Sequence, residues 1–244
     1  LLSAQGRVLY DFLFYPDLKN KEFSCFVDCH HSEKTDLMKR LNMYKLRSKV
    51  VFSDSENLSV FICDEKKESF FSDPRHSELP FRAVRGKEAT DFDFLVNNDF
   101  YKKRLDLCVA EGPSEITRGE ALPLDYWMDK TSHVSFNKGC FIGQEVTARV
   151  YHRKKIRRRL ISINNQKIKL EPNKITDKSL RYINQIGEIV LLLAPVDLIN
   201  KFEASNNKPE IIFNDATKMI KERIINITCL LYTSPSPRDR QKSR

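Results

Sequence analysis

Apolar residues of the types found in β-strands are concentrated near the start of the chain. Val8–Phe14 and Glu22–Asp28 are rich in Val, Phe, Tyr and Leu, and Pro16–Asn20 between them has turn-forming residues. This pattern predicts a β-hairpin.

The next stretch changes its period. From Glu33 to Lys49 the apolar residues fall three and four positions apart among lysines and arginines, which predicts an amphipathic helix. Val50–Phe52 and Leu58–Cys63 then return to β-type residues. The order of these elements predicts a sheet with a helix packed on one face.

Proline punctuates the middle of the chain. Asp73-Pro74-Arg75 interrupts the pattern and predicts a sub-boundary near residue 73. Beyond it the patterns predict a short strand at Phe81–Val84 and a helix at Phe94–Val109, which Glu111-Gly112-Pro113 ends. A short helix or turn at Ala121–Asp129 and a further strand at Val134–Phe136 are predicted to follow.

The pattern of residue types changes again after Arg159. Short β-type segments follow, at Leu160–Ile163, Ile168–Leu170, Ile186–Ala194 and Ile211–Phe213. We therefore expect an α+β region over residues 1–159 and a small, separate β-rich C-terminal domain over 160–228. Residues 229–244 differ from everything before them and are expected to be a non-native or disordered tail. Because the chain enters a strand-like pattern without an initiator Met, we expect a native N-terminal portion to be missing.

Composition narrows the class of protein. The 244 residues are 41% hydrophobic and 31% charged, typical of a globular protein, and the longest apolar run, Ile189–Val196, is shorter than the roughly 20 residues of a membrane span. The six cysteines are scattered without a CxxC pair, which favours a reducing compartment over a disulfide framework.

The net charge of +9 is concentrated in one place. Seven cations and no acid lie between Val146 and Arg159. Such a run indicates an anionic partner, namely polyglutamyl or phosphate groups, RNA or an acidic protein face. A solvated face of a helix or strand is an equal alternative.

The residues Lys138–Glu145, with the sequence KGCFIGQE, precede this basic run. Their two glycines place Cys140 on a turn just before a regular element. Lys138 and a helix beginning near Gly143 would favour the thiolate of Cys140 and make it a nucleophile, a metal ligand or a redox sensor. The alternative is a small buried residue in a tight turn. His133 and His152 are near in sequence, but no triad can be assembled.

Other side chains suggest ligand contacts. Gln144 and Glu145 suit the donor and acceptor edge of a pterin or purine, although an acid is also favoured in the first turn of any helix. Trp127 can wall a ring-binding pocket, or can simply be core. Cys25, Cys29 and His31 share one strand face, but three groups on one element rarely complete a metal site, and no metal is assigned.

The motif KGCFIGQE, continuing to Arg149 and on to His152-Arg153, resembles the KGCYxGQE signature of the YgfZ-type folate-binding proteins, relatives of the glycine cleavage T-protein. Weaker similarity extends over roughly residues 1–195, at Gln5-Gly6-Arg7 with Asp11, Asp73-Pro74-Arg75, Glu111-Gly112-Pro113 and Ile186-Gly187-Glu188. Phe141 replaces the usual tyrosine of the motif.

The resemblance implies a T-protein-like folate-binding α+β fold around a central opening, with a small C-terminal β-barrel. It implies tetrahydrofolate as cofactor and Cys140 as the functional thiol, which makes a transient iron–sulfur cluster contact. The residues expected at the cofactor are Lys138, Gly139, Gly143, Gln144, Glu145, Arg149 and Trp127.

The function implied is that of an accessory factor, not a catalyst, which assists assembly or repair of iron–sulfur clusters. Its partners would be assembly proteins and client enzymes, including radical-SAM and tRNA-modifying enzymes. The location would be the cytoplasm in a bacterium or the mitochondrial matrix in a eukaryote. The alternatives are a tetrahydrofolate-dependent aminomethyl transferase and a tRNA-binding module that uses the basic run.

Overall fold

The chain opens with the expected hairpin. The computed structural model describes residues 1–17, 24–55, 57–89, 97–164 and 179–204. Strands β1 (Phe12–Pro16) and β2 (Cys25–Cys29) pair antiparallel, with Phe14 opposite Val27. The hairpin prediction is therefore confirmed, and both strands begin later in the sequence than the pattern indicated.

The predicted amphipathic helix is also present. A short 3-10 turn, η1 (His31–Glu33), leads into α1 (Lys34–Tyr44), which buries Leu37. The helix ends before Lys49, and Leu46 just beyond it has a left-handed φ of 48°. Such a conformation is unfavourable for a branched side chain and is incompatible with a continuing right-handed helix.

The predicted single sheet in this region is wrong. β3 (Leu58–Cys63) pairs antiparallel with β4 (Phe81–Gly86), so that two separate two-stranded sheets form. Val50–Phe52 is not a strand. The partner of β3 lies downstream in the chain, and a pattern of single strands carries no information on which strands pair.

Four short helices form the middle of the molecule. They are α2 (Asn97–Asp106), α3 (Gly112–Glu115), the 3-10 helix η2 (Pro123–Tyr126) and α4 (Gln144–His152). Gly112 and Pro113 begin α3, while α2 ends earlier, at Asp106. The strand predicted at Val134–Phe136 is absent, since the Val134 N–H bonds to the Met128 carbonyl and the Phe136 ring stacks on Tyr151.

The last described elements form a three-stranded sheet. β5 (Arg158–Asn164), β6 (Arg181–Ile186) and β7 (Ile189–Pro195) are antiparallel in the order β5-β7-β6, and α5 (Val196–Ala204) follows. The predicted segments Ile168–Leu170 and Ile211–Phe213 and the tail from Cys229 lie outside the described residues. The T-protein-like fold and the C-terminal barrel stay predictions.

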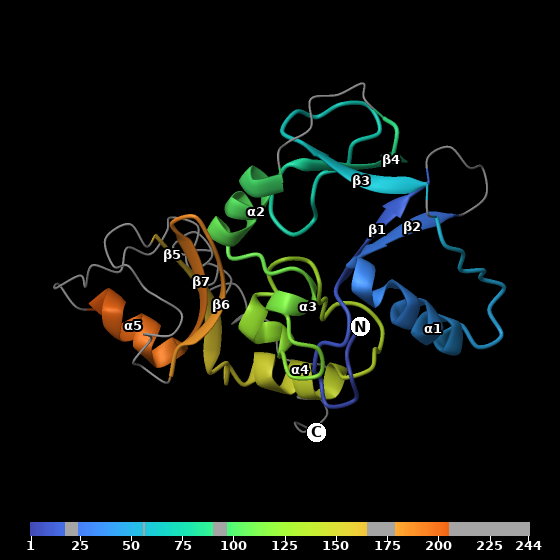
Figure 1. Cartoon of the computed structure of the whole chain (residues 1–244). Helices are drawn as coiled ribbons and strands as arrows, with labels where there is room; N and C mark the ends of the chain where they lie inside the picture. Colours follow the sequence, from blue (N-terminus) through green and yellow to red (C-terminus); the bar gives the residue numbers. More distant parts are fainter. Residues whose placement is uncertain (18–23, 56, 90–96, 165–178, 205–244) are drawn as a thin grey trace.

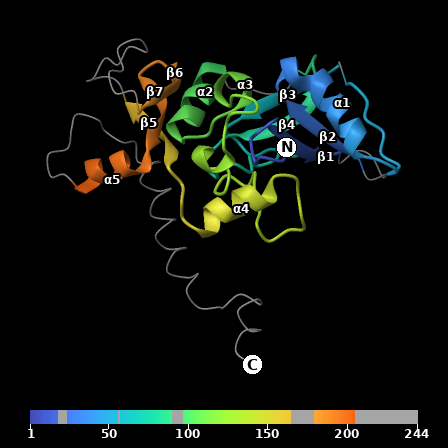
Figure 2. The same ribbon diagram turned by 90° about the horizontal axis from the view of Figure 1, so that it is seen from below.

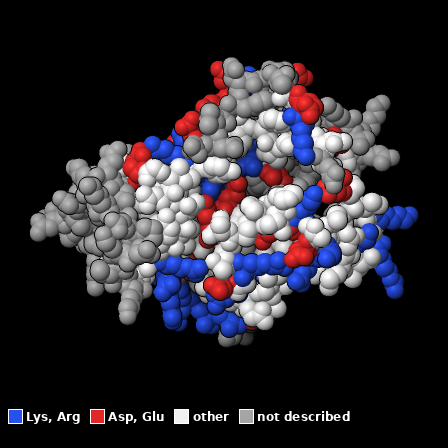
Figure 3. Space-filling model, viewed as in Figure 1, with Lys and Arg blue, Asp and Glu red and all other residues white. Residues whose placement is uncertain are grey.

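The helices and sheets are arranged around a central group of helices. The sheet β5-β7-β6 and α5 lie on one side, the hairpin and α1 on the other, and α2, α3 and α4 between them (Figure 1). A view from below shows α4 on one flank of this arrangement (Figure 2). Acidic and basic side chains gather at a hollow in the middle of the face seen in Figure 3. None of the described helices is both long enough and apolar enough to cross a bilayer.

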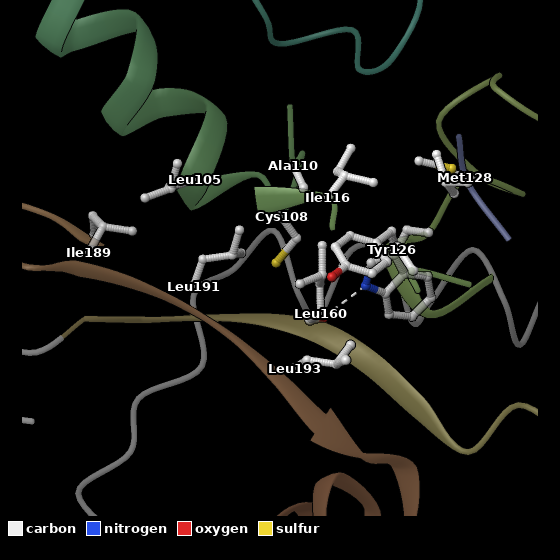
Figure 4. Close-up of a cluster of buried hydrophobic side chains, with 13 residues drawn as sticks. Leu105, Cys108, Ala110, Ile116, Tyr126, Met128, Leu160, Ile189, Leu191 and Leu193 are labelled. Atoms are coloured by element: carbon white, nitrogen blue, oxygen red, sulfur yellow. Dashed lines mark hydrogen bonds between the residues drawn. The ribbon is translucent and has the colours of Figure 1, made fainter. Parts of the chain in front are cut away.

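The largest core cluster joins the sheet to the rest of the chain. Leu160, Leu191 and Leu193 from one sheet face pack with Leu105 and Trp127 (Figure 4). The opposite face packs in a second cluster that includes Leu192 and Ile199 of α5. Consecutive side chains of β7 thus point to opposite faces, as in any strand.

Candidate functional site

The KGCFIGQE motif forms a surface loop and the start of α4. Gly143 is the N-cap of the helix, with a left-handed φ of 82°. Gln144 Oε1 accepts a hydrogen bond from the Phe141 N–H at 3.1 Å and thereby closes the turn. Cys140 is exposed. Cys140 lies in the loop directly before this turn, so its predicted place just before a regular element is confirmed, and the alternative of a buried residue is wrong.

The charged side chains of the motif make contacts within the motif. The Lys138 ammonium lies 5.0 Å from the centre of the Phe141 ring, and Glu145 pairs with Arg149 one turn along the helix. The described contact of Lys138 is therefore with the Phe141 ring. Stabilisation of the Cys140 thiolate by Lys138 stays a prediction.

The basic run carries fewer free cations than the sequence indicated. Arg159 is buried, pairs with Asp129 at 2.8 Å, and stacks 4.0 Å over the Trp127 ring. Arg149 is the partner of Glu145. At least two of the seven cations therefore serve contacts within the molecule.

Trp127 is a core residue. Its side chain is buried, and its indole N–H donates to the Leu160 carbonyl at 2.8 Å. It does not line the cleft described below. The interpretation of Trp127 as the wall of a ligand pocket is wrong, and the alternative that it is core is confirmed.

A cleft of about 370 Å³ lies at the central hollow of Figure 3. The hairpin, α2, α3 and β6 contribute its walls. The side chains that give it its polar character are Asp11, Asp28, Cys29, His30, Arg75, Arg82, Tyr101, Arg104, Glu111, Ser114, Glu115 and Asn184.

One side of the cleft is an ion-pair network. Arg75 is held by Asp73 at 2.7 Å and also bonds to Glu111, while Arg82 reaches Asp28 at 2.7 Å. Arg75 and Asp73 are almost completely buried, at 1% and 0% side-chain exposure. A buried charge is tolerated only when it is paired and hydrogen-bonded, so this network fixes the wall rigidly.

A second buried pair lies next to this network, because the Glu111 N–H donates to Glu115 Oε2 at 2.9 Å. Arg104 binds both carboxylate oxygens of Glu115 at 2.6 and 2.8 Å, in the bidentate geometry typical of arginine. Asn184 of β6 donates to the same carboxylate at 2.7 Å. Side chains from α2, α3 and the C-terminal sheet therefore meet at one carboxylate.

The acids of the cleft differ in their ionisation. Burial raises the pKa of Glu111, but the nearby Arg75, Arg82 and Arg104 outweigh it and lower that pKa to about 2. Burial raises the pKa of Asp28, with Arg82 opposing. Burial, with Asp28 and Glu33, also raises the pKa of the Cys29 thiol. Among the described residues no group of three or more potential ligands is placed to hold a metal ion.

Asp11 connects the cleft with the segment before the motif. Its carboxylate lies 3.0 Å from His133 Nε2, and His133 Nδ1 lies 2.8 Å from Thr131 Oγ1. A carboxylate oxygen can only accept here, so Nε2–H is the donor. His133, which could not be assigned to a triad, thus pairs with an acid at the cleft.

The motif and the cleft are two distinct places on the molecule. The predicted cofactor residues Lys138, Gly139, Gly143, Gln144, Glu145 and Arg149 do not line the cleft. The sequence reasoning missed the acids and arginines that do. A signal was present, since Asp11, Arg75, Glu111 and Ile186, which come from the four weakly similar segments, all meet in the cleft.

Comparison with known proteins shows similarity to one class, the iron–sulfur cluster assembly factors. No protein-family model matches the chain. Several curated proteins similar to it are named as mitochondrial iron–sulfur cluster assembly factors. The iron-sulfur cluster assembly factor IBA57 homolog of Pyricularia oryzae is 33% identical over 177 residues, which are 66% of this chain and 46% of that protein. The IBA57 proteins of Mus musculus and Homo sapiens are 33% and 31% identical over 187 and 186 residues, each covering 66% of this chain and 51% of the relative. The chain thus spans about half the length of the curated relatives it matches.

Proposed function

We propose that this protein assists iron–sulfur cluster assembly in mitochondria, binds a reduced folate in the central cleft, and uses Cys140 on the exposed motif loop. The names of its relatives support the assembly role and the location. The observation that carries the ligand proposal is the cleft itself, where segments far apart in sequence bring carboxylates, guanidiniums and an amide together.

The chemistry of the cleft suits a pterin ring. A pterin presents N–H donors and ring acceptors side by side along one edge, and the cleft offers carboxylates as acceptors and arginines and Asn184 as donors. Tyr101, with 37% of its surface exposed, adds an aromatic face. A T-protein-like fold around this opening is part of the same proposal.

Titration with tetrahydrofolate under reducing conditions tests the ligand. We expect Tyr101→Ala to weaken binding about tenfold through loss of ring contact, which is worth about 1.4 kcal/mol. Tyr44→Ala is the matched control, because Tyr44 is equally exposed at 37% but lies on α1 away from the cleft. Equal affinities of the two variants would place the ligand elsewhere. Turnover of an aminomethyl donor with folate would favour a transferase instead.

Complementation tests the thiol. In cells lacking the assembly factor, we expect Cys140→Ser to lose the ability to restore iron–sulfur enzyme activity. Cys25→Ser serves as control, because Cys25 is also an exposed free thiol. Full rescue by Cys140→Ser would remove Cys140 from the proposed mechanism.

A further inference from the structure

The segment Leu2–Asp11 contacts both the motif and the cleft. At the motif, a Cβ on Gly143 would lie 2.5 Å from the Ser3 carbonyl oxygen, and one on Gly6 would lie 3.1 Å from Thr147 Oγ1. Backbones this close leave room only for glycine. The first turn of α4 therefore rests directly on this segment.

The other end of the segment reaches the cleft. Val8 exchanges backbone hydrogen bonds with Ala121 and Gly119, which hold the segment against the body of the molecule. Three residues further on, Asp11 lines the cleft and accepts the hydrogen bond of His133. The side chains of Asp11 and His133 are only 8% and 13% exposed.

His133 is anchored on its second side as well. Its Nδ1 contacts Thr131 Oγ1, and that hydroxyl donates to the Trp127 carbonyl at 3.1 Å. The chain from His133 to Gly143, which carries Cys140, is thus a loop with both ends fixed to the same segment. One end is held by Asp11 and the other by Ser3 and Gly6.

We propose that Asp11 and His133 form a positioning pair that couples a ligand in the cleft to the loop bearing Cys140. This inference rests on the proposed function. A ring N–H of a reduced folate that bonds to Asp11 shares the carboxylate with His133 and draws negative charge away from the His133 hydrogen bond, because a carboxylate accepts at both of its oxygens. The ligand thereby weakens the hold on one end of the loop, so that the already exposed Cys140 gains mobility and reacts faster. Coupling of this kind requires that the ligand bind the two loop states unequally.

The rate of Cys140 alkylation by iodoacetamide, followed by peptide mass spectrometry, measures the coupling. We expect saturating tetrahydrofolate to raise the rate at Cys140 about fivefold. The rate at Cys25, in the same sample, should not change. His133→Gln should raise the ligand-free rate at Cys140, and tetrahydrofolate should then add less than twofold. Thr131→Val, which removes the second anchor of His133 together with the hydroxyl's bond to the Trp127 carbonyl, should act in the same direction.

His31→Gln is the control, because His31 is exposed in η1 and does not line the cleft. Calorimetry on the same samples separates the two proposals. Binding of tetrahydrofolate with an unchanged Cys140 rate overturns the coupling and leaves the proposed ligand intact. Absence of binding overturns both. Equal effects of His133→Gln and His31→Gln also overturn the coupling.

Discussion

The pKa values of individual carboxyl groups in this protein are shifted in opposite directions by their surroundings. The arginines of the cleft outweigh burial at Glu111 and bring its pKa to about 2. At Asp125 burial raises the pKa to about 6, and Arg159, Arg158 and Arg7 oppose it only in part. Glu111 therefore stabilises the fold as a carboxylate, whereas ionised Asp125 costs stability.

The pH dependence of Glu111→Gln follows from this shift. The ordinary pKa of glutamate is about 4.5, so the stabilisation by Glu111 is present above that pH and is lost as the pH falls toward 2. We expect the variant to lower the free energy of unfolding by about 1–2 kcal/mol at pH 7, a reduced value because the carboxylate is 30% exposed. The deficit should shrink toward pH 2 in urea titrations.

Asp125→Asn is the opposite control. Its carboxyl is protonated more readily in the folded than in the unfolded chain, so its cost is absent below pH 4 and complete above pH 6. The variant should be more stable than the parent at pH 7 and equal to it at pH 3.5. A loss of stability at pH 7 would contradict the expected sign.

Among the structural elements, those with a local cause were predictable from the sequence. The period of α1, the hairpin and the glycine before α4 are each encoded within one short stretch of neighbouring residues. The cleft was not predictable, because its ion pairs join residues such as Asp28 with Arg82 and Arg75 with Glu111 that are distant in the chain. For the same reason the pairing of β3 with β4 was missed.

The contact between residues 2–6 and the start of α4 can be tested at Gly143, with Gly139 as the control. Gly143→Ala should lower the free energy of unfolding by about 2 kcal/mol or more, because the residue has a left-handed φ and its Cβ would collide with the Ser3 carbonyl. Gly139→Ala, in the same motif, meets nothing within 4 Å of its Cβ. Urea unfolding of both variants checks the difference. Equal stabilities would show that residues 2–6 are not held against the helix.

At the scale of the whole molecule, the largest core cluster joins the C-terminal sheet to the central helices. The C-terminal sheet contributes Leu160, Leu191 and Leu193 to the same cluster as Trp127. The domain boundary expected at residue 160 stays a prediction, but this shared core implies that the two parts unfold together.

Substitutions at two neighbouring leucines test whether the two parts unfold together. Leu191→Ala and Leu192→Ala should each lower the free energy of unfolding by about 3–4 kcal/mol, since both side chains are fully buried. Only Leu191 packs in the cluster of Trp127, so only its loss should shift the tryptophan emission of the folded protein. Fluorescence and far-ultraviolet circular dichroism should report one common transition. Separate transitions would establish an independent C-terminal unit.

The segment Leu2–Asp11 also bears on the order in which the molecule is assembled. Its partners lie more than a hundred residues downstream, at Gly119, Ala121, His133 and Gly143. During synthesis this segment emerges before its partners and has nothing to dock on until α4 has emerged. Contacts of such high sequence separation form slowly. The step that seats the Cys140 loop should therefore be among the last in folding.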